Sequence, residues 1–305
     1  MKKMLEEILN DCSAYAKNGA TASYIPELAK ADLNDFGICV ISRDGKMDFA
    51  GDYEKKFTMQ SVVKPLILLL ALEDSGAESI SKLCGVEATG KPFDAFNYSD
   101  LALRSEHINP MINAGAIVLC TFVKGTNYDE KFDRLLNLAR KLSENENLSI
   151  NESVYRSEKI TGNKNRALAY MLKAYKMIDG DIEEILDMYF KACSIFVNCK
   201  DLANIALVLA NHGKSIKSNE QLVSAEHARQ VNAIMTTCGM YDGSGEFALK
   251  VGIPAKSGVG GGIMATVPSR MGIGIYSPSL DKKGNSIAGV KALEQLSKKA
   301  DLSIF

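Results

Sequence analysis

The chain has 305 residues, enough for one large domain or two ordinary ones, and its 46% hydrophobic and 24% charged residues are typical of a globular protein. Its 36 lysines and arginines nearly balance its 37 aspartates and glutamates, for a formal net charge of -1. This balance argues against a nucleic-acid-binding protein, which usually carries a basic excess.

The first predicted element is an amphipathic helix over residues 2–18, in which acidic residues interrupt the apolar positions. A secretory signal peptide instead has an uninterrupted apolar core. The longest apolar run in the chain, residues 65–72, is far shorter than the ~20 residues that cross a membrane. We therefore expect a cytoplasmic protein with neither a membrane nor a nucleic-acid partner.

Strands are predicted near both ends of the chain. Residues 36–42 form the first strand, Asp44-Gly45 favours a hairpin turn, and residues 46–51 form the returning strand. Alternating apolar residues predict another strand over residues 270–276. A loop, a strand around residues 286–289 and a final helix around residues 290–299 are expected to follow. Together the strands predict one antiparallel sheet, with the end helices covering a face.

The middle of the chain is predicted to be mostly helical. The helices span residues 62–74, 114–123, 129–144, 152–160, 165–177, 182–192, 200–212 and 225–235. Because no Pro/Gly/Ser-rich linker and no repeat divides the chain, we expect a single α+β domain over residues 1–305. Its sheet subregion would comprise about residues 1–60 and 245–305 and its helical subregion about residues 61–244, with a site in the cleft between them.

Cysteine and histidine patterns give no sign of a metal site. The seven cysteines form no CxxC pair, and several lie in apolar runs, which indicates buried free thiols in a reducing compartment. The histidines, at positions 107, 212 and 227, form no HExxH or similar cluster. We therefore expect no metal.

The first motif that carries chemistry is Ser61-Val62-Val63-Lys64. At the start of a helix, this spacing places the serine and the lysine on the same face. A lysine in a partly dry cleft can lose its proton and act as a base toward the serine hydroxyl. The helix N-terminus also favours negative charge on the nucleophile.

The same S-x-x-K pattern starts at Ser79 and Ser279, so the pattern alone is weak. A capping serine followed by a solvated lysine is the alternative at each position. Ser79 is predicted to cap a short exposed helix, and Ser279 to lie in a hairpin turn. Ser61 differs because Pro65, tolerated in a first helical turn, and a long apolar run follow it. This context places Ser61 at the mouth of a buried helix.

The second motif is Lys256-Ser257-Gly258-Val259-Gly260-Gly261-Gly262. In serine acyl-enzymes of the penicillin-binding class, a Lys-Thr/Ser-Gly segment lies on the strand beside the active site. Glycines let a substrate approach the backbone, and an N–H group after them can donate to an oxyanion. A flexible glycine-rich loop is the alternative, and a phosphate-binding loop is disfavoured because the G-K-[ST] ending is missing.

The third motif is Asn109-Pro110-Met111-Ile112-Asn113. An asparagine just before an apolar helix is usually an N-cap. Beside a Ser-x-x-Lys site, the second asparagine can instead hold an amide or amine of a substrate.

Five segments together resemble the serine-dependent glutaminases, in the family's order and at its spacings over nearly the whole chain. They are Tyr24-Ile25-Pro26-Glu27-Leu28-Ala29, Gln60-Ser61-Val62-Val63-Lys64, Asn109-Pro110-Met111-Ile112-Asn113-Ala114-Gly115-Ala116, Cys238-Gly239-Met240-Tyr241-Asp242 and Ala255-Lys256-Ser257-Gly258-Val259-Gly260-Gly261-Gly262. The resemblance implies a β-lactamase/penicillin-binding-like fold and an enzyme that hydrolyses L-glutamine to L-glutamate and ammonia without a cofactor. It also implies a homo-oligomer, a dimer or a homotetramer, of the compact bacterial type.

The resemblance also implies roles for individual residues. Ser61 would be the nucleophile, Lys64 its base and Tyr241 a proton relay to the leaving ammonia, while the backbone N–H groups of Ser61 and Val259 would form the oxyanion hole. The residues implied around the glutamine are Tyr24, Ser61, Asn113, Glu158, Asn165, Tyr189, Tyr241 and Val259.

These implied roles make chemical sense for glutamine. A carboxylate such as Glu158 pairs with the α-ammonium, and Asn and Tyr side chains can donate to the α-carboxylate. Taken singly, however, Tyr189 and Tyr241 are ordinary core aromatics and Glu158 is a solvated helix residue. Only the family resemblance favours their place in the site.

Two other functions are open at this point. One is a different acyl-serine enzyme, a β-lactamase or a peptidase, which would share Ser61, Lys64 and Lys256-Ser257-Gly258 but usually carries an export signal. The other is a non-catalytic amino-acid sensor that keeps the pocket but lacks a nucleophile or a base. Both groups are present here, which favours an enzyme.

Overall fold

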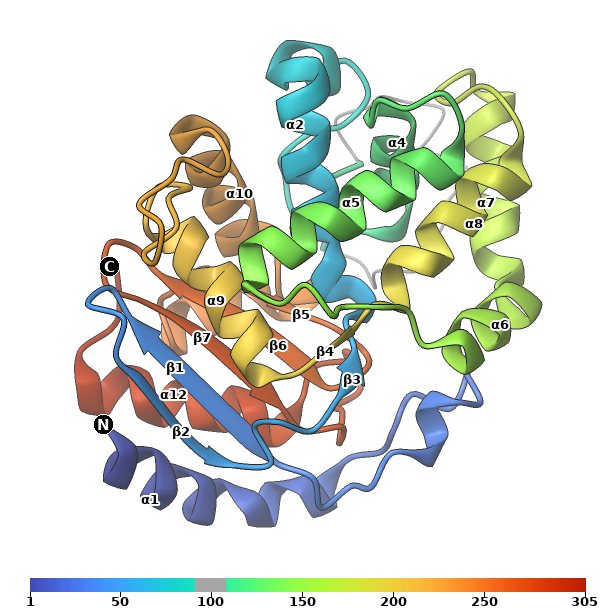
Figure 1. The fold of residues 1–305 in the computed structure, drawn as a ribbon. Helices are drawn as coiled ribbons and strands as arrows, with labels where there is room; N and C mark the ends of the chain where they lie inside the picture. Colours follow the sequence, from blue (N-terminus) through green and yellow to red (C-terminus); the bar gives the residue numbers. More distant parts are fainter. Residues whose placement is uncertain (91–107) are drawn as a thin grey trace.

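A computed structural model describes residues 1–90 and 108–305, and it combines an antiparallel sheet with a larger group of helices (Figure 1). The five strands follow the order β2-β1-β7-β6-β5, and all neighbours are antiparallel. Their bounds are β1 Gly37–Ser42, β2 Met47–Gly51, β5 Ala255–Ser257, β6 Gly262–Val267 and β7 Met271–Tyr276. Strands from both ends of the chain therefore share one sheet, as the sequence predicts.

One face of this sheet is covered by two helices from opposite ends of the chain, α1 (Lys2–Ser13) and α12 (Ile287–Ala300) (Figure 1). Leu5 of α1 and Leu296 of α12 are fully buried in one apolar cluster with Ile275 of the sheet. Burying each such side chain stabilises the fold by roughly 1.5–3 kcal/mol. The predicted amphipathic helix is confirmed, although it ends at Ser13.

The opposite face of the sheet packs against α9 (Cys199–Ala210), a helix from the middle of the chain (Figure 1). Gly272 and Gly274 of β7 lie under it. A Cβ atom built on either glycine would lie 2.0 Å from a carbonyl oxygen of α9. Residues two apart on a strand point to the same face, so these two glycines allow the helix to lie directly on the strand backbone.

Six of the remaining helices form a second region around α2 (Lys64–Ser81), whose apolar residues 66–72 are buried. They are α4 Asn113–Phe122, α5 Tyr128–Ser143, α6 Glu152–Thr161, α7 Asn163–Ala174, α8 Ile182–Cys193 and α10 Ala225–Cys238. The short helix α11 (Ser244–Lys250) instead packs its buried Phe247 into the apolar cluster of the sheet. A short ladder of β3 (Phe57–Thr58) and β4 (Phe196–Val197) joins this region to the sheet. All eight predicted helices are confirmed, with shifted ends.

Two features near the C-terminus differ from the prediction. The strand expected at residues 286–289 is wrong, because the Ser286 side chain accepts a hydrogen bond from the Gly289 N–H group and caps α12. The loop after β7 thus leads directly into the final helix. Strand β6, which begins at the last residue of the glycine-rich motif, is not among the predicted strands.

All seven cysteines are buried free thiols, as the sequence predicts. Within the ranges 1–90 and 108–305, the structure contains no helix with the length and apolar character needed to cross a bilayer.

Candidate active site

Ser61 and Lys64 meet at the start of α2. Ser61 lies in the 3-10 turn Gln60–Val63, and Lys64 begins the α-helix with Pro65 in its first turn. The Lys64 Nζ atom is 2.8 Å from Ser61 Oγ, and the lysine side chain is completely buried. Burial lowers the pKa of Lys64 to about 8. A lysine with such a pKa is partly neutral near neutral pH and can then accept the serine proton.

Asn113, the first residue of α4, links Lys64 to two further polar side chains. Its Oδ1 atom accepts hydrogen bonds from Lys64 Nζ at 2.7 Å and from the Tyr189 hydroxyl at 3.2 Å. Its Nδ2 group donates to Asn165 Oδ1 at 2.9 Å. The N-cap position of α4 belongs to Ile112, so the side chain of Asn113 does not cap its helix. The structure thus brings together four residues that the sequence predicted for one site.

Glu158 of α6 is a buried carboxylate held by Gln60. The Gln60 Nε2 group donates a 2.6 Å hydrogen bond to Glu158 Oε1, and both residues are at most 5% exposed. Burial raises the pKa of Glu158 to about 8, although Gln60 and Lys64 both favour the ionised form. Near neutral pH the group is therefore largely protonated in the free protein, and an incoming cation would favour its ionisation. Gln60 belongs to one of the five family-like segments, but the sequence predicts no role for it.

Tyr241 and Val259 approach Ser61 from the sheet side of the molecule. Tyr241 begins the 3-10 turn Tyr241–Gly243, is 8% exposed and has a positive φ of 55°. Burial raises the pKa of its hydroxyl, and a hydrogen bond with Ser61 opposes this rise. The predicted strand at the Lys256-Ser257-Gly258 motif is confirmed, because β5 is the edge strand of the sheet.

The glycines after β5 let this segment touch the turn that carries the nucleophile. A Cβ atom at Gly258 would lie 2.6 Å from the Met59 carbonyl oxygen, and one at Gly260 would lie 2.7 Å from that of Thr58. Only glycine fits at such distances, so the motif is a close-packing segment and not a free loop. Val259, between the two glycines, is thereby held beside Ser61.

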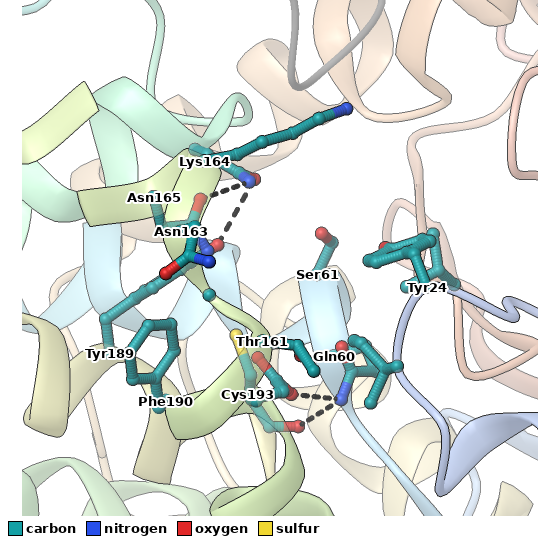
Figure 2. A pocket seen from close by; sticks show the side chains of 15 residues that line it. Tyr24, Gln60, Ser61, Thr161, Asn163, Lys164, Asn165, Tyr189, Phe190 and Cys193 are labelled. Carbon is teal, nitrogen blue, oxygen red and sulfur yellow. Dashed lines mark hydrogen bonds between the residues drawn. The ribbon is translucent and has the colours of Figure 1, made fainter. Parts of the chain in front are cut away.

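A cavity of about 260 Å³ opens beside Ser61 (Figure 2). Its walls include all of the predicted binding residues except Tyr241, namely Tyr24, Ser61, Asn113, Glu158, Asn165, Tyr189 and Val259. Lys64 and Tyr241 are buried outside its lining, and Tyr24 is 56% exposed. Residues that the sequence did not indicate also line it, among them Asn163, Phe190 and Cys193. Asparagine is common in helix caps, and phenylalanine and cysteine are common in protein cores. No local sequence pattern therefore indicates that these residues line a site.

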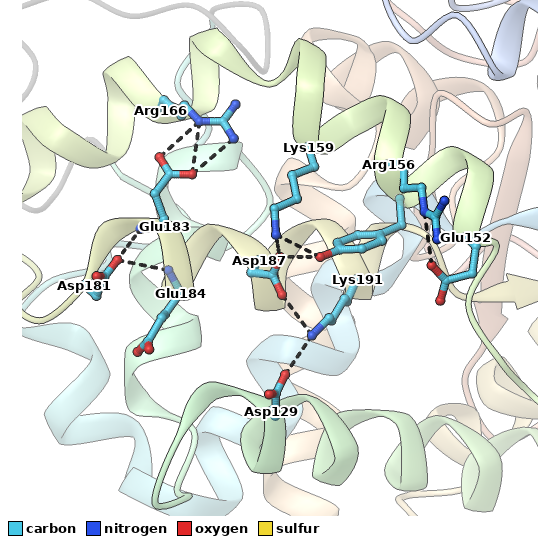
Figure 3. A network of polar contacts seen from close by, with 11 residues as sticks. Asp129, Glu152, Arg156, Lys159, Arg166, Asp181, Glu183, Glu184, Asp187 and Lys191 are labelled. Carbon is cyan, nitrogen blue, oxygen red and sulfur yellow. Dashed lines mark hydrogen bonds and ion pairs between the residues drawn. The ribbon is translucent and has the colours of Figure 1, made fainter.

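A charged network on the outer side of the site fixes two of its helices relative to each other (Figure 3). Asp187 of α8 accepts hydrogen bonds from Lys159 Nζ and from the Tyr155 hydroxyl, both on α6. Lys191 of α8 bridges Asp187 and Asp129 at 2.8 and 2.7 Å. Lys159 directly follows Glu158, and Tyr189 lies on α8, so the network joins the two helices that carry these cavity side chains.

Among the residues that the structure describes, no group of three His, Cys, Asp or Glu side chains is arranged to hold a metal ion. His107, one of the three histidines considered above, lies outside the described residues.

Comparison with known proteins connects this site to one family. A family model described as Glutaminase matches residues 19–305. A glutaminase of Clostridioides difficile (strain 630) is 51% identical over 302 residues, which cover 99% of this chain and 98% of the relative. The chain belongs to the glutaminase family. This family is the one that the sequence motifs resemble.

Solved structures of the family superimpose closely on the chain. A Bacillus subtilis glutaminase in covalent complex with 5-oxo-L-norleucine, formed from 6-diazo-5-oxo-L-norleucine, gives a TM-score of 0.91 at 38% identity. That match covers 100% of this chain and 99% of the other. The protein Mglu in its tris and glutamate form gives a TM-score of 0.95 at 36% identity, covering 100% of this chain and 67% of the other. The predicted α+β, β-lactamase-like fold class is confirmed.

Proposed function

We propose that the protein hydrolyses L-glutamine to L-glutamate and ammonia through an acyl-enzyme on Ser61, with Lys64 as the general base. The contact of 2.8 Å between Lys64 Nζ and Ser61 Oγ, beside the cavity, carries this proposal. Membership of the glutaminase family supports the overall reaction. The named covalent complex of the Bacillus subtilis relative supports covalent chemistry in a related protein.

Substrate recognition follows from the charges of glutamine. The α-ammonium would pair with the Glu158 carboxylate, and the side chains of Asn113, Asn165 and Tyr189 would form hydrogen bonds with the α-carboxylate and fix its orientation. Tyr24, exposed at the rim, would cover the bound substrate. Because buried polar groups are left unpaired by analogues that lack these charges, the site rejects such analogues.

Acylation begins when Lys64 takes the Ser61 hydroxyl proton and Ser61 Oγ attacks the amide carbon. The backbone N–H groups of Ser61 and Val259 would donate to the oxyanion, and one such donor typically accounts for 10²–10³ in kcat. The C–N bond then breaks while Tyr241 gives its hydroxyl proton to the departing nitrogen. Lys64 returns a proton to Tyr241, and a glutamyl ester of Ser61 remains.

Deacylation uses the Ser61 and Lys64 pair in reverse. A water molecule loses a proton to the neutral Lys64 amine and attacks the ester carbonyl carbon. The tetrahedral adduct collapses, Ser61 Oγ regains a proton, and glutamate leaves. No step draws on a metal or an organic cofactor. The cytoplasmic location and the homo-oligomeric state, dimer or tetramer, stay predictions.

The decisive experiment measures ammonia release from L-glutamine and, in parallel, from L-asparagine. We expect glutamine-selective release by the wild type and none by Ser61→Ala, with both proteins folded by circular dichroism. An active Ser61→Ala variant would show that the nucleophile lies elsewhere. A wild type that is inactive between pH 6 and 9 would show that L-glutamine is not the substrate. Rapid turnover of a chromogenic cephalosporin would instead indicate a β-lactamase, and glutamine binding without ammonia release would indicate a sensor.

A further inference from the structure

A second buried lysine lies beside the site and has no part in the reaction as described above. Lys256, in the edge strand β5, is fully buried. Its Nζ atom donates to the Gly239 carbonyl oxygen at 3.0 Å and to the Ser257 carbonyl oxygen at 2.6 Å. Gly239 closes α10 two residues before Tyr241, and Ser257 lies two residues before Val259. One side chain therefore joins the two segments that bring Tyr241 and Val259 to Ser61.

Lys256 also contacts Tyr241 directly. Its Nζ atom lies 4.3 Å from the centroid of the Tyr241 ring, so the amine packs against the aromatic face in either protonation state. Tyr241 needs such support, because its positive φ of 55° is unfavourable for a tyrosine and persists only where the surroundings hold it. The two segments are in backbone contact, since a Cβ atom at Gly239 would lie 1.8 Å from the Ala255 carbonyl oxygen.

Lys256 is poorly placed to act as a base for Ser61. The serine hydroxyl is already engaged by Lys64, and Lys256 donates its hydrogen bonds to the backbone carbonyl groups of Gly239 and Ser257. Burial and the charge of Lys64 lower the pKa of Lys256 well below its ordinary value. A neutral amine would keep two N–H donors, so the link between the segments does not depend on protonation.

We infer that Lys256 is a positioning residue that holds the Tyr241 hydroxyl where it can protonate the leaving nitrogen. The inference rests on the proposed role of Tyr241. In that step the C–N bond of the tetrahedral adduct breaks, its electron pair stays on nitrogen, and the proton comes from the Tyr241 oxygen. Lys256 contributes no atom and no proton. Its effect should therefore appear only with substrates whose leaving group needs a proton.

The test compares L-glutamine with a γ-thioester of L-glutamate, whose thiolate leaves without a proton. The variants are Lys256→Met, which keeps the length of the side chain, Lys256→Gln, Tyr241→Phe and the Lys256→Met/Tyr241→Phe double variant. General acid catalysis contributes about 10²–10⁴-fold, so both single variants should lose about that much kcat on L-glutamine with KM little changed. On the thioester each should lose less than about tenfold. The double variant should be no slower on L-glutamine than Tyr241→Phe alone.

Any other outcome would contradict either the role of Lys256 alone or the proposed role of Tyr241 as well. If Lys256→Met and Lys256→Gln slow both substrates equally while Tyr241→Phe discriminates between them, Lys256 is merely structural and only this inference fails. Multiplicative losses in the double variant lead to the same conclusion. If Tyr241→Phe slows both substrates equally, Tyr241 is not the proton donor and its proposed role fails together with the inference. If Lys256→Met does not fold, Lys256→Gln and Tyr241→Phe still provide the comparison, and the wild type separately tests the overall reaction.

Discussion

The side-chain amide of Gln60 donates a 2.6 Å hydrogen bond to the carboxylate of Glu158, so the residue directly before Ser61 holds the buried acid of the cavity. Gln60 adopts a positive φ of 49°, unusual for a glutamine. The same strained residue thus connects the turn that carries the nucleophile with the group proposed to bind the substrate ammonium.

Replacing Glu158 with glutamine should separate charge recognition from catalysis. Removing one partner of a buried ion pair costs about 3–5 kcal/mol, so kcat/KM for L-glutamine should fall about 10²–10³-fold or more. Glutaramate, which lacks the α-amine, should be hydrolysed by Glu158→Gln at least as fast as by the wild type. Steady-state kinetics with both compounds test this. An equal loss on the two compounds would show that Glu158 does not face the ammonium.

The raised pKa of Glu158 also predicts that the stability of the fold changes with pH. The folded-state pKa of Glu158 is raised to about 8, above its ordinary value of 4.5, so the folded protein binds more protons than the unfolded chain between these limits. Glu158 therefore destabilises the fold progressively as the pH rises through that window. We expect the melting temperature of Glu158→Gln, relative to the wild type, to increase from pH 5 to pH 8. A constant difference would contradict the raised pKa.

Placing a charge beside Lys64 should move the pH dependence of the reaction. Asn113→Asp would put a carboxylate about 2.7 Å from Lys64 Nζ, where an opposite charge favours the ammonium form by 1–3 pKa units. In the wild type, kcat/KM should rise as Lys64 loses its proton around pH 8. In Asn113→Asp the rise should shift to higher pH. Asn113→Ala removes the same hydrogen bonds without adding charge, and its profile should shift less.

The network around Asp187 (Figure 3) should contribute to substrate binding as well as to stability. Asp187→Asn removes the charge shared by Lys159 and Lys191 at a site that is only 20% exposed, and we expect a loss of about 1–3 kcal/mol with a raised KM. Glu152→Gln is the matched control, because its ion pair with Arg156 on the same helix is 61–77% exposed. The control should change stability by less than about 0.5 kcal/mol. Urea denaturation and KM measurements on both variants test this. Equal effects of the two substitutions would show that the Asp187 network contributes no more than an exposed ion pair.

The contact of α9 with β7 should not tolerate a methyl group. Gly274→Ala would place a Cβ atom 2.0 Å from a carbonyl oxygen of Cys199, and overpacking of this kind costs about 1–3 kcal/mol or more. Gly245→Ala in α11 meets nothing within 4 Å and should be neutral or stabilising. Thermal melts of the two variants check this difference. A fully stable Gly274→Ala protein would show that α9 can move away from the sheet.

Much of the site could be predicted because its signals are local. Ser61 and Lys64 lie three residues apart, and the proline and apolar run that follow them define a buried helix. The edge strand at Lys256 could also be placed, since its glycines require close backbone approach. The prediction of a strand at residues 286–289 failed because Ser286 is a helix cap, and apolar residues that follow a cap also suit a short strand.

The rest of the site depends on contacts between residues far apart in the chain. Nothing near Asn113 shows that it binds Lys64 and Asn165 in place of capping its own helix. Gln60 has no local feature that reveals its positive φ or its partner 98 residues later. Lys256 could be placed on its strand, but its contact with Tyr241 depends on how α10 meets the sheet. Such pairings are set by packing of the whole chain.

The two glycines beneath α9 also bear on how the enzyme opens. A helix seated directly on a strand backbone has little freedom to tilt, and α9 follows, after one short strand, the helix α8 that carries Tyr189. Hinge motion between the sheet and these helices would have to break that close contact. Such a motion would therefore cost stability, and we expect admission of the substrate to depend on side chains at the rim, such as the exposed Tyr24.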